Sequence, residues 1–255
     1  MQRLLGNQLL HMRKQITAMK KTIIIGTRGS KLALWQTNWV KQQIEKGFPE
    51  LTVEIVTIKT TGDMITDRPL AAVGGKGLFV KEIEKALLES SIDIAVHSMK
   101  DMPGDLPDGL VIGAIPQREN PFDVLISKDN LSLDQLPKGA KVGTSSLRRA
   151  SQIKHARPDL KTASIRGNLD TRLKKLASGE FDATLLAAAG LHRLGMEEKI
   201  SQYLDEKIML PAVGQGALCI ESRDGDEELA PVLAYLNHPE TNTVVTGERA
   251  FLQRL

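Results

Sequence analysis

The stretch TIIIGTRGSKLALWQTNWVKQQIEKG, residues 22–47, predicts a β-strand followed directly by an α-helix. Residues 22–26 form a short apolar run rich in β-branched side chains, which is typical of a buried strand. Ser30 is expected to cap the helix that fills the rest of the stretch. Apolar residues recur there near helical spacing, and we expect Trp35 and Trp39 to face the core as an i, i+4 pair.

Working outward, the same alternation of strand and helix repeats and then starts again. Further strands are predicted at 51–59, 92–97, 110–115 and 122–127, with a helix at 77–89. A second series has strands at 140–143, 160–165 and 183–186, with helices at 145–156 and 168–178. Such alternation indicates two α/β lobes with largely parallel sheets. We place the crossings between them at 116–121, where two prolines bracket polar residues, and at 211–216.

Composition excludes several classes of protein. The 255 residues are 41% hydrophobic and 25% charged, as in soluble globular domains. No apolar run approaches the ~18 residues of a membrane span. A net charge of +3 with 4% aromatic residues argues against nucleic-acid binding. The single cysteine excludes a disulfide framework and fits a cytoplasmic setting, and the five histidines show no metal-ligand spacing.

The basic segment 1–19 is interpreted as a disordered arm or as sequence ahead of a later start at Met12 or Met19. A short organelle presequence is the alternative, because such segments are basic and poor in acid.

Polar and cationic residues gather where the predicted strands end. Ligands of open α/β sheets bind beyond the carboxyl ends of the strands, and helix N-termini there offer free N–H groups to anions. The residues at these junctions are Arg28, Ser30, Asp63, Ser98, Lys100, Asp101, Thr144, Ser145, Ser146, Arg148, Arg149, Arg166, Gly167, Asn168 and Arg172. If the two lobes face each other, so many cations imply a ligand with several spaced negative groups. Asp63 and Asp101 are acids among these bases, and they either balance charge or take part in chemistry.

Three further features have ordinary structural interpretations. The glycine-rich segment 74–77 does not match a phosphate loop, because Gly77 and Leu78 follow Lys76. Cys219 lies in an apolar run and is expected to be a buried small residue. His97 ends an apolar strand and is expected to be a core histidine.

Seven long motifs in this chain resemble the porphobilinogen deaminase family. They are GTRGSKLALWQT from Gly26, VGGKGLFVKEIE from Val73, DIAVHSMKDMP from Asp93, GTSSLRR from Gly143, IRGNLDTRL from Ile165, LAAAGLHRLG from Leu186 and LPAVGQGAL from Leu210. The resemblance covers nearly all of the chain beyond the arm.

The resemblance implies three α/β domains, the first two like the lobes of a periplasmic binding protein. Domain 1 is then 20–116 with a returning segment at about 211–237, domain 2 is 119–210, and domain 3 begins at about 238 and is cut off at 255. It also implies a monomer that acts on porphobilinogen, binding neither nucleic acid nor membrane.

The implied activity joins four porphobilinogen units into the linear tetrapyrrole hydroxymethylbilane on a covalent dipyrromethane primer. Each pyrrole carries an acetate and a propionate, which accounts for the cations at the junctions. By resemblance, the junction residues listed above, with Arg193 and Gln215, bind cofactor or substrate. Asp101 matches the catalytic aspartate and Asp63 balances charge. Residues 64–75 form a loop over the site, to which Met64, Gly74, Gly75 and Lys76 are assigned.

The family's primer cysteine lies in a motif like EGGCQ that follows ERAFLQRL. We therefore expect the attachment cysteine beyond Leu255 rather than at Cys219, and we expect the chain as given to be truncated. Without that cysteine, we expect the chain as given to carry no covalent dipyrromethane and to make no hydroxymethylbilane. The alternative to the transferase is a two-lobed polycarboxylate-binding protein without catalysis.

Overall fold

The computed structural model describes residues 20–64 and 77–254, and these form two compact units. Unit 1 contains the described residues up to Arg118 and those from Ala217 onward, and unit 2 is Glu119–Gly216. Residues 211–216, predicted to return to the first lobe, thus group with unit 2. The prediction that a third domain begins near residue 238 stays a prediction. None of the described helices has the length and apolarity needed to cross a bilayer.

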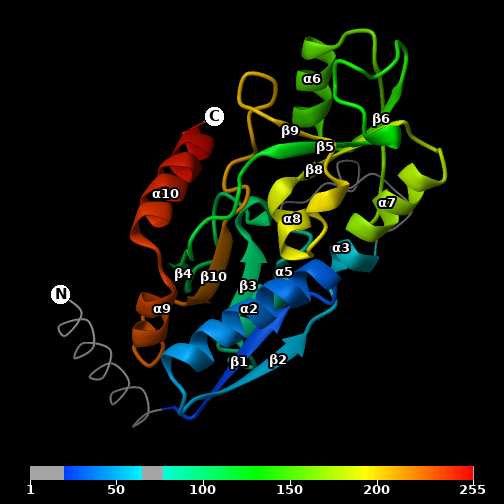
Figure 1. Ribbon diagram of the computed structural model, residues 1–255. Coiled ribbons are helices and arrows are strands. Elements are labelled where there is room, and N and C mark those ends of the chain that lie inside the picture. The colour runs from blue at the N-terminus through cyan, green and yellow to red at the C-terminus, as the bar shows by residue number, and fades with distance from the viewer. Residues whose placement is uncertain (1–19, 65–76, 255) are drawn as a thin grey trace, which may run out of the picture. The chain divides into compact units, whose positions relative to one another are not determined.

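Unit 1 is built on a five-stranded sheet of order β2-β1-β3-β10-β4. Its strands are β1 Thr22–Thr27, β2 Thr52–Thr57, β3 Ile94–Ser98, β4 Leu110–Ala114 and β10 Leu218–Arg223. Its helices are α2 Lys31–Gly47, α3 Thr61–Met64, α5 Lys81–Leu88, α9 Ala230–Leu236 and α10 Pro239–Arg254, and a 3₁₀ turn spans Met99–Asp101. β1 pairs in parallel with β2 and β3, whereas β10 runs antiparallel to both β3 and β4. The sheet is therefore parallel-rich, as predicted, with one reversed strand that arrives from the far end of the chain (Figure 1).

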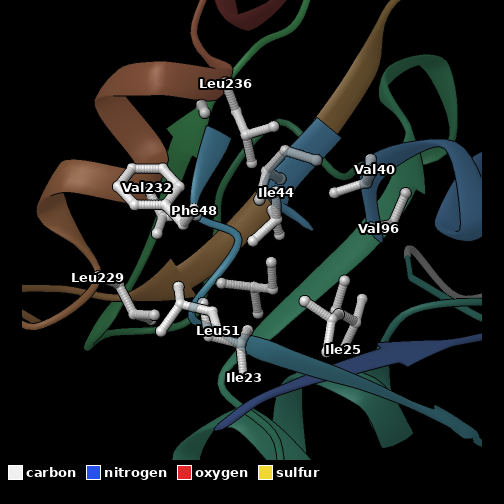
Figure 2. Packing of buried hydrophobic residues seen from close by; sticks show 14 of the residues in the cluster. Ile23, Ile25, Val40, Ile44, Phe48, Leu51, Val96, Leu229, Val232 and Leu236 are labelled. Carbon is white, nitrogen blue, oxygen red and sulfur yellow. The ribbon is translucent and has the colours of Figure 1, made fainter. Parts of the chain in front are cut away.

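Both faces of this sheet are covered. α2 and α9 pack on one face, where Ile23, Val96 and Ile220 from the sheet meet Ile44 and Val232 (Figure 2). α5 packs on the other face through a separate group that includes Ile83, Leu87 and Ala95. A sheet buried on both sides explains why its central strands have continuous apolar runs rather than alternation.

Unit 2 repeats the plan with a five-stranded sheet of order β7-β6-β8-β5-β9. Its strands are β5 Asp123–Ser127, β6 Lys141–Gly143, β7 Lys161–Ala163, β8 Ala183–Ala187 and β9 Gln202–Leu204. Its helices are α6 Leu147–Ala156, α7 Leu169–Ala177 and α8 Ala188–Arg193, with 3₁₀ turns at Lys128–Asn130 and Glu197–Lys199. β6 is parallel to β7 and β8, and β5 is the reversed strand, antiparallel to β8 and β9.

Two local predictions are wrong. Trp35 is 38% exposed, because the buried face of α2 is formed by other residues, among them Thr37, Val40 and Ile44. Trp39 does pack, partly buried, against the core. The helix predicted at 77–89 begins only at Lys81, since Gly77 has φ of +80° and residues 77–80 form a turn.

Candidate functional site

A pocket in unit 1 lies where β1 and β3 end, as expected for a sheet with parallel strands. Arg28 and Ser30 follow β1, while Ser98 and Asp101 follow β3, and all of them line the pocket. Gln36 and Phe79 complete this part of the lining. The backbone N–H of Ala33 donates to Ser30 Oγ at 3.2 Å, so Ser30 caps α2 as predicted.

Arg28 is positioned by an acid and an aromatic ring. Its guanidinium donates to both carboxylate oxygens of Asp63 and stacks 4.1 Å from the centre of the Phe79 ring. Thr60 Oγ1 also donates to Asp63, at 2.7 Å. Burial raises the pKa of Asp63, but the hydrogen bonds from Arg28 and Thr60 and the charge of Arg28 outweigh it and hold that pKa below its ordinary value. Asp63 therefore stays ionised and fixes the direction of the Arg28 fork.

The 3₁₀ turn after β3 presents Asp101 and Lys100, both exposed, next to the buried Met99. Asp101 lines the pocket that Arg28 also lines. Ser98 is held by α2, because Gln36 Nε2 donates to Ser98 Oγ at 3.1 Å. The acid thus stands in a pocket whose polar side chains are already oriented.

In unit 2, two strand-end loops are tied together. Ser145 Oγ lies 2.8 Å from Ser164 Oγ and donates to the carbonyl of Ile165 at 2.7 Å. This joins the loop after β6 to the loop after β7 and gathers the N-termini of α6 and α7. Ser146 caps α6, and its N–H donates to Thr144 Oγ1 at 3.2 Å.

The start of α7 depends on a glycine and an asparagine. Asn168 Oδ1 accepts from the N–H of Thr171 at 3.0 Å, so Asn168 is the N-cap. Gly167 has φ of +107°, and a Cβ there would lie 2.5 Å from the Thr171 side chain, so only glycine fits.

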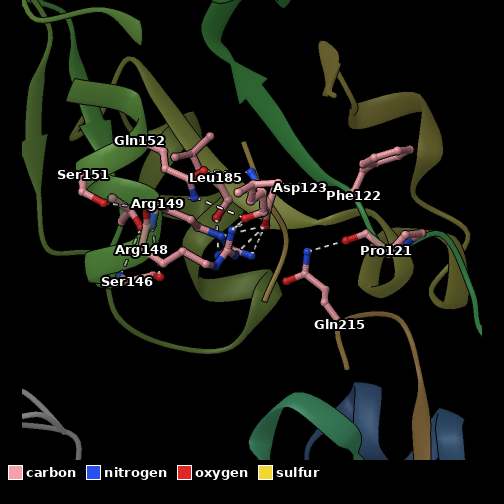
Figure 3. A network of polar contacts seen from close by, with 12 residues as sticks. Pro121, Phe122, Asp123, Ser146, Arg148, Arg149, Ser151, Gln152, Leu185 and Gln215 are labelled. Atoms are coloured by element: carbon pink, nitrogen blue, oxygen red, sulfur yellow. Dashed lines mark hydrogen bonds and ion pairs between the residues drawn. The ribbon is translucent and has the colours of Figure 1, made fainter. Parts of the chain in front are cut away.

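Arg148 and Arg149 share one buried carboxylate, that of Asp123 at the start of β5 (Figure 3). Arg148 Nη1 lies 2.6 Å from Asp123 Oδ2, and Arg149 Nε lies 2.8 Å from Oδ1. Burial raises the pKa of Asp123, but hydrogen bonds and charges from both arginines outweigh it and lower that pKa. One carboxylate facing two guanidiniums leaves an excess of positive charge.

Arg172 adds to that excess. Burial and the charge of Arg149 both lower the pKa of Arg172, so the two guanidiniums repel each other. Its Nε donates to the carbonyl of Gly167 at 2.9 Å, and no carboxylate among the described residues pairs with it. Arg166, half-buried in the same loop, likewise forms no ion pair within residues 20–64 and 77–254. Arg149 thus interacts with both Arg148 and Arg172, and Asp123 pairs with Arg148 and Arg149.

Arg193 is the last residue of α8, and Gln215 lies in the segment by which the chain leaves unit 2. The side chain of each donates to a main-chain carbonyl. Arg193 Nη2 donates to the carbonyl of Gly216 at 2.6 Å, and Gln215 Nε2 donates to that of Pro121 at 2.7 Å. Burial lowers the pKa of Arg193 to about 10, an effect that Glu119 partly offsets, so Arg193 stays charged at neutral pH. Their assignment to ligand binding stays a prediction.

The predicted covering loop falls largely outside the described residues. Gly74, Gly75 and Lys76 lie there, and so does the arm at 1–19. Met64, the last residue of α3, is described and is 67% exposed. In the described ranges no group of three or more His, Cys, Asp or Glu side chains is arranged to hold a metal ion.

Sequence reasoning missed three side chains that position this chemistry: Gln36, Phe79 and Asp123. Asp123 gave the clearest signal, because an acid that opens an apolar strand must be paired when that strand is buried. Gln36 and Phe79 gave none, since a glutamine on a helix and a phenylalanine in a loop are ordinary. Cys219 is fully buried in β10, as predicted.

Comparison with known proteins places this arrangement in one family. Residues 23–231 match the family model described as "Porphobilinogen deaminase, dipyromethane cofactor binding domain". The chain is 58% identical to a porphobilinogen deaminase of Brevibacillus brevis over 231 residues, which are 91% of this chain and 75% of that protein. It is 54% identical to the porphobilinogen deaminase of Syntrophus aciditrophicus, covering 91% and 76%.

Solved structures agree with the predicted fold class. An ancestral cationic amino acid solute-binding protein superposes with a TM-score of 0.51 at 16% identity, covering 95% of this chain and 98% of that one. A putative methionine-binding lipoprotein of Bacillus subtilis gives a TM-score of 0.51 at 14% identity, covering 88% and 93%. At this identity the likeness shows a shared fold alone, that of periplasmic binding proteins. On the sequence matches, the chain belongs to the porphobilinogen deaminase family, transferases of porphyrin biosynthesis that carry a dipyrromethane cofactor.

Proposed function

We propose that this chain, once it holds the dipyrromethane primer, deaminates porphobilinogen and joins the units head to tail into the linear tetrapyrrole hydroxymethylbilane, with its arginines binding the pyrrole carboxylates. The observation that carries the proposal is the uncompensated charge of unit 2. Arg172 is partly buried, interacts unfavourably with Arg149 and has no carboxylate partner among the described residues. A buried cation of this kind is stable only with an anion beside it, and a pyrrole acetate or propionate is such an anion.

The residues present fit a dipyrromethane. Its two methylene-linked rings carry several carboxylates, and unit 2 offers four arginines, of which two share one aspartate. The four arginines are Arg148, Arg149, Arg166 and Arg172. The capped N-termini of α6 and α7 add backbone donors for the same oxygens. When bound, the dipyrromethane supplies the free pyrrole carbon to which each new unit is joined.

Asp101 is the proposed catalytic residue, and its part is electrostatic. Loss of ammonia from porphobilinogen leaves an electron-poor azafulvene whose ring nitrogen carries positive charge when protonated. A carboxylate beside that N–H stabilises the developing charge and can relay the proton. Asp101 lines the unit 1 pocket with Arg28 and Ser30. In this proposal Arg28 and Ser30 bind the acidic side chains of a pyrrole.

We further propose a monomer that works in the cytoplasm. The monomer is what the family resemblance implies, and a single buried cysteine suits a reducing compartment.

Calorimetric titration with porphobilinogen tests the binding proposal. Arg172→Gln removes the unpaired cation, and we expect it to weaken binding by about tenfold or more, as for a lost charge-assisted hydrogen bond. Lys174→Gln, an exposed change on the same helix, is the matched control and should bind as the wild type does. Equal affinity in wild type and Arg172→Gln would contradict the proposal.

A further inference from the structure

Beneath the unit 1 pocket lies a buried pair that the site described above does not use. His97 Nε2 lies 3.0 Å from Glu221 Oε2, with side-chain exposures of 4% and 0%. The pair is set by sheet register: His97 on β3 is opposite Cys219 on β10, and Glu221 follows two residues later on the same face. That face is the one covered by α5.

A second carboxyl group, that of Glu84 on α5, belongs to the same buried set. Burial and the charge of Glu221 raise the pKa of Glu84, while His97 and Lys81 act in the opposite direction. Glu84 Oε1 and Glu221 Oε1 each lack a hydrogen-bond partner within the described part of the chain. Two buried carboxyl groups thus lie beside one imidazole, and burying charge in this way is costly.

His97 connects this set to the pocket, because it lines the same pocket as Asp101 and Arg28. The other charged or titratable groups that act on the set, or on Cys219 beside it, come from three elements. Lys81 on α5 acts on Glu84, and Cys219 on β10 interacts with Glu221. Arg249 on α10 acts on Cys219. Lys81 is a cation, so it favours the ionised form of Glu84.

The proposed reaction has a proton to dispose of. When the methylene carbon bonds to the free α-carbon of the terminal pyrrole, the α C–H bond breaks. Its electron pair restores the aromatic ring, and its hydrogen leaves as a proton. Ammonia has already departed with the electron pair of the carbon–nitrogen bond, so the balance needs a base near the pocket, and no oxidant or reductant is involved.

We propose that His97, with Glu221 and Glu84 behind it, accepts this proton and returns it to solvent between additions. Glu221 orients the imidazole and compensates the charge it gains, in the manner of a carboxylate behind a catalytic histidine. Glu84 sets how firmly the proton is held. The inference rests on the proposed function and adds a proton-accepting set that is separate from Asp101.

The dependence of kcat on pH distinguishes a proton-carrying role of the buried set from a purely structural one. If the set only packs the sheet, conservative variants change stability but leave the shape of the kcat profile alone. If the set carries the proton, its macroscopic ionisation appears in the profile and moves when one member is changed.

The experiment compares kcat against pH for wild type, Glu84→Gln, His97→Gln and the control Glu89→Gln. Glu89 is exposed at the end of the same helix and is outside the set. Glu84→Gln removes one carboxyl group from the set, so the set as a whole takes up a proton less readily, and the acid limb should move to lower pH by about one unit. His97→Gln should lower kcat by about a hundredfold with little change in KM. Superimposable profiles for wild type and Glu84→Gln would overturn the inference.

A stability measurement keeps the inference testable even if His97→Gln folds poorly. Because the folded-state pKa of Glu84 is raised, its contribution to stability is present at low pH and is lost as pH rises through that pKa. Glu84→Gln should therefore lose less stability than wild type between about pH 5 and about pH 8. Equal losses would show that Glu84 holds no proton and would also overturn the inference. A wild-type protein without turnover would instead refute the proposed function, and the two failures are thus distinct.

Discussion

Asp123 Oδ1 accepts a hydrogen bond from Arg149 Nε at 2.8 Å, in the interior of unit 2, while its other oxygen is bound by Arg148. Asp123 is fully buried and has no exposure to water. This one carboxylate therefore holds the side chains of both arginines at the α6 N-terminus. It thereby fixes the direction of the guanidinium N–H groups that do not bond to Asp123.

Replacing Asp123 with asparagine should destabilise the protein severely. The change leaves two guanidiniums near each other without their counter-charge, and breaking a buried pair in this way costs about 3–5 kcal/mol. Urea unfolding gives the free energy directly. Asp129→Asn, an exposed change in the same unit, is the matched control. A loss below about 1 kcal/mol for Asp123→Asn would show that the arginines find other partners.

The ion pairs of Asp123 also predict how the stability of the protein depends on pH. The folded-state pKa of Asp123 is lowered, so its stabilising contribution is present above the unfolded pKa and is lost as pH falls through the folded pKa. We expect wild type to lose stability steadily below about pH 4, and Asp123→Asn to lose less over that range. Parallel stability curves for the two proteins would contradict this.

Arg172→Gln should make the ligand-free protein more stable, although it weakens ligand binding. The substitution removes a partly buried cation that is repelled by Arg149. No carboxylate among the described residues pairs with this cation. Relief of about 1 kcal/mol would raise Tm by about 2–4 °C in a protein of this size. Thermal unfolding without ligand measures it, and Lys174→Gln should leave Tm unchanged. A clear fall in Tm for Arg172→Gln would mean that Arg172 is a structural residue.

Asp101→Asn should separate catalysis from binding. The side chain is exposed, so the variant should fold as wild type does, and its amide can still occupy the pocket. Loss of one preorganised charge typically lowers kcat by ~10²–10³-fold. Steady-state kinetics with porphobilinogen should show that loss in kcat with KM little changed, and Asp108→Asn serves as an exposed control. Half of the wild-type rate in Asp101→Asn would exclude the catalytic role.

Cys219 should be inert in the folded protein. Burial and the neighbouring Glu221 raise the pKa of its thiol, against a smaller effect of Arg249, so little thiolate forms at neutral pH. A chromogenic disulfide reagent should label it only after denaturant is added. Rapid labelling of the native protein, or a dipyrromethane adduct on Cys219 by mass spectrometry, would contradict this.

The sequence predicts β1 to β8 and the helices α2, α5, α6 and α7, because each depends on local pattern, but it does not predict β9, α3, α8 or α9. Strand ends mark ligand sites in such sheets, so Arg28, Ser146 and Asn168 could be chosen as candidate site residues without a structure. The reversed direction of strands β5 and β10 could not be predicted, since it is decided by long-range pairing. Nor could the partners Asp123 and Glu221, because burial of an acid depends on which elements pack over it.

Ammonia release from porphobilinogen tests the central claim most directly, since it separates a deaminase from a protein that only binds polycarboxylates. The purified protein, with its dipyrromethane primer attached, should release one ammonia for each porphobilinogen consumed, with linear pyrrole oligomers forming in step. Both rates should fall together in Asp101→Asn and should be unaffected in Asp108→Asn. Saturable binding of porphobilinogen without any release of ammonia would contradict the account.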